Sequence, residues 1–202
     1  MKRYQLLSLV LLITSPVFVH RVDGKPKSVL IEEYAIYSTI LNAPILHRQK
    51  EFPIKLNKGH RFVINNRTSG VVKPEWIVDV GRWDTGLVSP RLKASVEDMV
   101  AKNKNTYSLH KKFALKHKYS LFSIEKFADI FTKNGPVVGY EVFHQKYGKS
   151  SAFYTFSRVG FNSKHNKAVV YVTVSCSPIC AYFRFVELIK FKGKWKVTYE
   201  FG

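Results

Sequence analysis

The sequence predicts an α+β domain in which N-terminal helices pack on a four-stranded antiparallel meander at the C-terminus. The helices are indicated by apolar residues that recur at three- and four-residue intervals in the first part of the chain. The sheet is indicated by four consecutive runs of β-branched and aromatic residues that polar turns separate. Runs joined by short turns favour antiparallel pairing over the parallel sheet of an α/β protein.

Residues 1–24 have the layout of a secretory signal peptide. Two basic residues precede an uncharged apolar run, Leu6–Ile13, and polar residues follow it. The run is too short for a membrane-spanning helix, which needs about 20 apolar residues. We therefore expect cleavage near Lys25, a single domain over residues 25–202 without a transmembrane segment, and a secreted or periplasmic location. An uncleaved N-terminal helix is the alternative.

The chain is strongly basic, with 33 Lys and Arg against 14 Asp and Glu and a formal net charge of +19. Between Asp98 and Glu125 there is no acidic residue at all. Such charge attracts anionic lipid headgroups, acidic polysaccharide or nucleic acid. It also keeps an exported protein soluble, so charge alone does not choose a partner. A hydrophobic content of 46% excludes a disordered chain.

Two helices are expected before the basic segment. The first runs from Ser28, its N-cap, to about Asn42, with tyrosines and leucines on the buried face. The second begins with Ser89 as the cap and Pro90 at the first helical position, and it ends by Lys102.

A short strand is expected at residues 61–65, between these two helices. After the basic segment, Ser123 caps a third helix that runs from residue 124 to about residue 133 and ends at Gly135. A short helix over residues 138–147 follows it.

A lysine-rich strand is expected between residues 112 and 121, because apolar and polar residues alternate there. His117 stands among the inward-facing residues, so we expect a histidine at the edge of the core rather than a catalytic base. The outward face is positively charged and is predicted to bind anions. The lysines of this predicted anion site are Lys111, Lys112, Lys116 and Lys118.

The C-terminal sheet is expected to contain four strands. A polar turn at residues 162–167 follows the first strand, and Lys192–Lys194 forms a tight hairpin loop between the last two. The strands are predicted at residues 153–161, 168–175, 182–191 and 195–201.

The two cysteines of the chain, Cys176 and Cys180, lie in the connection between two of these strands. In an exported protein we expect a disulfide, which would staple the connection around Pro178. A redox pair and two ligands of a metal site are the alternatives. The spacing is one residue longer than C-x-x-C, and no suitably spaced histidine pair accompanies it, so neither is favoured. No metal or cofactor is expected.

Four C-terminal segments stand in a fixed order: Ser-Arg-Val-Gly-Phe-Asn at residues 157–162, Ala-Val-Val-Tyr-Val at residues 168–172, Leu-Ile-Lys at residues 188–190, and a Gly-x-Trp-x-Val pattern at residues 193–197. Together they resemble a family of uncharacterised bacterial secreted proteins. The order of elements is also similar to NTF2-like folds. The resemblance implies export but no activity, and NTF2-like folds host enzymes and binding modules alike. The chain departs from the family at the cysteine loop, where Ser-Pro-Ile replaces a glycine-rich stretch.

Catalytic chemistry has little support in the sequence. It contains no nucleophile elbow, zinc-protease motif, phosphate-binding loop or dinucleotide fingerprint. Arg158 is a further candidate for binding an anion, and pairing with Glu187 on a neighbouring strand is the alternative that we favour. We therefore expect a non-enzymatic binding module for an anionic surface or partner. The alternative is a small secreted hydrolase or nuclease with a pocket between helices and sheet, using His117 or His144 as general base.

Overall fold

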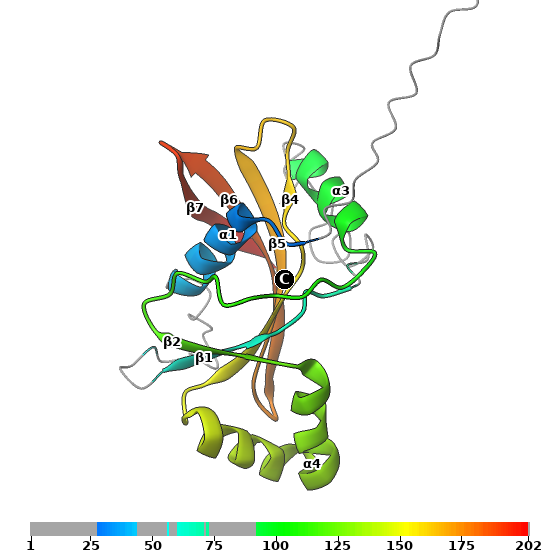
Figure 1. The fold of residues 1–202 in the computed structure, drawn as a ribbon, viewed down its shortest axis with the longest axis vertical. Coiled ribbons are helices and arrows are strands. Elements are labelled where there is room, and N and C mark those ends of the chain that lie inside the picture. The colour runs from blue at the N-terminus through cyan, green and yellow to red at the C-terminus, as the bar shows by residue number, and fades with distance from the viewer. Residues whose placement is uncertain (1–27, 44–55, 57–59, 71, 73–91, 202) are drawn as a thin grey trace, which may run out of the picture.

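The computed structural model describes residues 28–43, 56, 60–70, 72 and 92–201. These residues form three helices and one mixed sheet of seven strands, which confirms the α+β class (Figure 1). The predicted signal peptide, Ser89 and Pro90 lie outside the described residues.

The sheet is larger than the predicted four-stranded one and is mixed rather than antiparallel. Its strands are β1 (Arg61–Asn65), β2 (Lys118–Phe122), β3 (Ala152–Phe156), β4 (Gly160–Phe161), β5 (Lys167–Ser177), β6 (Cys180–Phe191) and β7 (Lys194–Phe201). The order is β2-β1-β3-β5-β6-β7, and β4 pairs with β5. The pairs β3–β5, β5–β6 and β6–β7 are antiparallel, whereas β1 lies parallel to both β2 and β3.

The strands mostly begin and end where the sequence predicts, with two corrections. The lysine-rich strand starts only at Lys118, and the strand expected over residues 153–161 is interrupted after Phe156. The loop between β6 and β7 is the predicted tight hairpin. Lys192 and Gly193 both have positive φ, at 47° and 75°, as a two-residue hairpin turn requires.

The helices cover both faces of the sheet. Helix α1 (Ile31–Asn42) packs on one face with the alternate β5 residues Val170, Val172 and Val174. Helix α3 (Lys93–Lys102) packs on the opposite face with Val169, and α4 (Ile124–Tyr147) packs there with Phe153. Figure 1 shows α3 and α4 at opposite ends of the molecule.

The helix ends follow local signals, with one exception. Ser123 Oγ accepts the N–H of Lys126 at 3.2 Å, which confirms the predicted cap of α4. Gly135, at φ 71°, breaks α4 into the two helical pieces that the sequence predicts. Ser28 does not cap α1. The N–H of Leu30 instead donates to Glu33 Oε1 at 3.3 Å, so the helix begins three residues later.

A buried ion pair joins α1 to the sheet where the chain passes from β3 to β4. The side chains of Arg158 and Glu33 are both 0% exposed. Arg158 donates from Nε to the two carboxylate oxygens, at 3.1 and 2.8 Å, and from Nη2 to Oε1 at 2.6 Å. The N–H of Val159 donates to the same carboxylate at 2.9 Å. Burial alone would lower the pKa of Arg158, but the hydrogen bonds and charge of Glu33 raise it.

The side chain of Asn103, the residue that ends α3, binds the backbone at the same point of the chain. Asn103 Oδ1 accepts the N–H of Arg158 at 2.7 Å, and Asn103 Nδ2 donates to the carbonyl of Arg158 at 3.2 Å. The ring of Tyr107 lies 4.5 Å from the guanidinium carbon. Two residues further on, Gly160 allows close packing, because a Cβ there would overlap the carbonyl oxygen of Ser95. The segment between β3 and β4 is therefore fixed to both α1 and α3.

Replacement of Glu33 by Gln should destabilise the fold by about 3–5 kcal/mol, because it leaves the guanidinium of Arg158 buried without its counter-charge. Chemical unfolding followed by circular dichroism measures this change. Glu32→Gln is the matched control. Glu32 is partly exposed and binds Lys190 at 2.6 Å, so its loss should cost less than about 1 kcal/mol. Equal effects of the two substitutions would contradict the central role of the buried pair.

Candidate functional site

The four lysines of the predicted anion site lie together on one segment of the chain. All four are exposed, and Lys118 is the first residue of β2, a strand at one edge of the sheet. Within the described part of the chain, none of the four ammonium groups has a carboxylate within 4.0 Å. The ammonium of Lys112 lies 5.9 Å from the ring centre of Tyr34. Toward the rest of the described chain, the segment therefore presents positive charge that no carboxylate pairs with.

The backbone of this segment is bound to α1 and does not form a strand before Lys118. Three polar residues spaced four apart on one face of α1 make the contacts. The hydroxyl of Tyr34 accepts the N–H of His110 at 2.8 Å, and Ser38 Oγ accepts that of Ala114 at 2.9 Å. Asn42 accepts the N–H of Lys116 at 3.1 Å and donates to the carbonyl of Ala114 at 3.0 Å.

Apolar side chains anchor the inner side of the same segment. The ring of Phe113 is buried, with its centre 5.2 Å from that of Tyr34 and 6.1 Å from that of Tyr37. Leu115 packs against the same core cluster. The alternation in the sequence thus correctly identifies the inward and outward residues, although the backbone there binds a helix instead of a neighbouring strand.

Arg158 does not join the four lysines. Its guanidinium is buried against Glu33, so its partner is not Glu187, the residue favoured from the sequence. The anion that Arg158 binds in this structure is a carboxylate of the same chain. Burial raises the pKa of Glu187, and the charge of Lys167 opposes that shift.

The two histidines considered as general bases lie against opposite faces of the sheet. The His117 ring contacts Phe62 with 5.9 Å between ring centres, on the face that α1 covers. The His144 ring lies 5.6 Å from that of Phe143, in the core under α4. His117 is partly buried, as expected of a histidine at the edge of the core. The structure does not bring the two together into one site.

Cys176 and Cys180 form the predicted disulfide, with 5.2 Å between their Cα atoms. The bond closes the tip of the β5–β6 hairpin, where Ile179 is 75% exposed. Among the described residues, no group of three His, Cys, Asp or Glu side chains is arranged to hold a metal ion.

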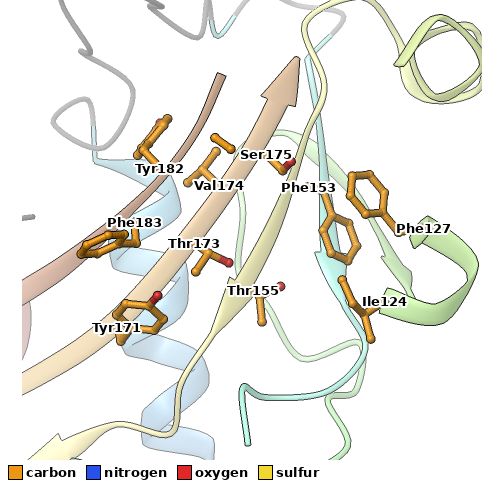
Figure 2. Close-up of a pocket in the computed structure, with 11 residues that line it drawn as sticks. Ile124, Phe127, Phe153, Thr155, Tyr171, Thr173, Val174, Ser175, Tyr182 and Phe183 are labelled. Atoms are coloured by element: carbon orange, nitrogen blue, oxygen red, sulfur yellow. The ribbon is translucent and has the colours of Figure 1, made fainter. Parts of the chain in front are cut away.

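A pocket of about 380 Å³ lies on the sheet face that α3 and α4 share (Figure 2). It is situated between the core cluster under α3, which contains Tyr171, and the cluster under α4, which contains Phe127 and Phe153. Its lining combines aromatic rings with hydroxyl groups. The lining residues are Ile124, Phe127, Phe153, Thr155, Tyr171, Thr173, Val174, Ser175, Ala181, Tyr182 and Phe183.

The alternative function predicts a pocket between helices and sheet, but none of these lining residues was predicted, although part of the signal is visible in the sequence. Thr173 and Ser175 are hydroxyl residues two positions apart in an apolar strand, so they share one face. Thr155 stands opposite Thr173 on β3, and this pairing depends on the register of the sheet. Burial raises the pKa of Tyr171, and it raises the pKa of Tyr182 to about 12. Both phenols therefore stay neutral near pH 7.

Comparisons with protein-family models, with curated proteins and with solved structures gave no match for this chain. No helix in the described ranges has the length and apolar character that crossing a bilayer requires.

Loss of the disulfide should lower the free energy of unfolding by about 2 kcal/mol, the value that loop-closure entropy gives for so short a loop. The comparison is between wild type and a Cys176→Ser, Cys180→Ser variant in urea unfolding. A reductant should shift the unfolding midpoint of the wild type and leave that of the variant unchanged. A wild type that is insensitive to reductant would show that the bond does not stabilise the fold.

Replacement of Asn42 by Ala should loosen the lysine segment without unfolding the domain, because it removes two hydrogen bonds to the segment. Amide hydrogen exchange should accelerate severalfold at Lys116, whose N–H loses its acceptor. The amides of β1, at residues 61–65, are the internal control and should keep their protection. Unchanged exchange at Lys116 would mean that α1 does not hold the segment.

Proposed function

We propose that this chain is an exported, non-enzymatic domain that binds a polyanionic surface through the lysine segment, residues 111–118. One observation carries the proposal: four exposed ammonium groups, none with a carboxylate partner among the described residues, stand on a backbone that α1 fixes by hydrogen bonds. A segment that is already ordered loses little conformational entropy on binding. Its electrostatic contribution to the binding free energy is therefore not offset by a cost of ordering the backbone.

The local charge balance supports a polyanion as the partner. No acidic residue occurs between Asp98 and Glu125, so the field around the segment is not cancelled by sequence neighbours. Lysines that neutralise a polyanion release its condensed counterions, and binding then falls steeply with salt. Heparin and anionic lipid vesicles are the two probes that separate a polysaccharide from a lipid surface.

An extracytoplasmic location belongs to the same proposal. A disulfide is typical of oxidising compartments, and the first 24 residues have the pattern of a signal peptide. A secreted or periplasmic domain would meet acidic polysaccharide and lipid headgroups directly. Membership of the family of bacterial secreted proteins and the NTF2-like fold remain predictions from the sequence.

The composition of the pocket favours binding over catalysis. The alternative function, a hydrolase or nuclease, needs a general base beside its substrate. The described lining contains no His, Asp, Glu, Lys or Cys, and its two tyrosines have raised pKa values. The described lining therefore offers no group that accepts a proton near pH 7.

Replacement of Lys112, Lys116 and Lys118 by Gln should weaken polyanion binding. The loss of affinity should be larger than in a control variant that lacks three lysines outside the segment. The measurements are elution from a heparin column in a salt gradient and cosedimentation with phosphatidylglycerol vesicles. The slope of log affinity against log salt should fall by about one for each lysine removed, because fewer counterions are released.

The charge-matched control is Lys164→Gln, Lys194→Gln, Lys196→Gln. All three lysines are exposed; Lys164 lies in the turn before β5, and Lys194 and Lys196 lie on β7, the edge strand opposite β2. This control should elute close to wild type. If both triple variants elute at the same salt concentration, binding is diffuse and the lysine segment is not the site. Loss on heparin alone identifies a polysaccharide, and loss on vesicles alone identifies a lipid surface.

A further inference from the structure

We infer that the pocket between α4 and the sheet is a second binding site, which takes a small, uncharged and mostly apolar molecule that carries one hydrogen-bonding group. This site is separate from the lysine segment. Its aromatic rings Tyr171, Phe183, Phe127 and Phe153 belong to the core clusters under α3 and α4. The lysine segment packs on α1, on the opposite face of the sheet. The pocket volume of about 380 Å³ falls within the range of small-molecule sites.

The floor of the pocket supplies unpaired hydroxyl groups. Thr155 and Thr173 stand opposite each other on β3 and β5, and neither hydroxyl has a hydrogen-bond partner in the described structure. Figure 2 shows both side chains on the pocket side of their strands. The third floor hydroxyl, that of Ser175, is hydrogen-bonded to the hydroxyl of Tyr140. The two threonines can therefore donate to or accept from a polar group of a ligand.

The walls of the pocket are apolar and aromatic. Phe127 lies flat on Phe153, with 4.1 Å between ring centres, and together they close the side next to α4. Tyr171 and Phe183, with ring centres 5.8 Å apart, close the opposite side. Figure 2 shows the two aromatic groups on either side of the threonines. Rings on two sides of a polar floor suit a ligand with an apolar body.

The absence of charge in the lining selects against ionic ligands. The chain contains 33 Lys and Arg, yet no charged residue is among the eleven that line the pocket. A charged ligand would lose hydration without gaining a counter-charge, which is costly in an apolar site. A neutral ligand has no such cost, so the lining discriminates by charge as well as by shape.

The test uses N-phenyl-1-naphthylamine, an uncharged aromatic probe with one N–H donor whose fluorescence rises in apolar surroundings. We expect saturable binding of one probe per chain. Thr173→Phe, which fills the centre of the pocket, should weaken binding at least tenfold. Thr173→Val keeps the shape and removes the hydroxyl, so it should weaken binding about threefold to tenfold. Thr198→Phe on β7, an exposed threonine outside the lining, is the control and should bind like wild type.

Each outcome decides the inference. Saturable binding that Thr173→Phe abolishes and Thr198→Phe preserves supports it. Fluorescence that does not saturate, or that both phenylalanine variants retain, overturns it. If circular dichroism shows that Thr173→Phe does not fold, the affinity of Thr173→Val is the test. Valine has nearly the same shape as threonine and suits a strand, so this variant should fold. Heparin elution of the Thr173 variants should match wild type, which separates this site from the lysine segment.

Discussion

The fold depends on the buried ion pair between Glu33 and Arg158. Removing two charges from water is costly, and the cost is offset here because the carboxylate accepts three hydrogen bonds from the guanidinium and one from the N–H of Val159. The pair lies where the chain leaves β3, and Asn103 holds the same point from α3. These contacts, which meet at Arg158, thus fix the positions of α1, α3 and the central strands relative to each other.

Helix α1 also binds the lysine segment and the β6–β7 hairpin. Its buried side carries Glu33, and a neighbouring row of residues 34, 38 and 42 binds the backbone of the lysine segment. Glu32 binds Lys190 and the indole N–H of Trp195 in the β6–β7 hairpin. Burial alone would raise the pKa of Glu32, but these partners outweigh it and lower the pKa. The lysine segment is ordered because α1 is ordered.

Residues 157–162 support the fold. Arg158 pairs with Glu33 of α1, and Gly160 lets α3 pack closely because it has no side chain. Asn162 Oδ1 accepts hydrogen bonds from two backbone N–H groups at the end of the following turn. The four lysines and the pocket threonines lie outside this segment. Residues 157–162 therefore belong to the framework of the fold, and the two proposed sites are built from other residues.

Local signals in the sequence determined the α+β class, the Ser123 cap, the break at Gly135, the Lys192–Gly193 hairpin and the disulfide. Each depends on residues only a few positions apart, so short-range sterics and hydrogen bonding specify it. Tertiary structure alone decided the parallel pairing of β1, the partner of Arg158 and the pocket. Glu33 lies 125 residues from Arg158, and Thr155 meets Thr173 only through sheet register. Such contacts are fixed by the packing of the whole chain, because each side chain has many equally suitable partners along the sequence.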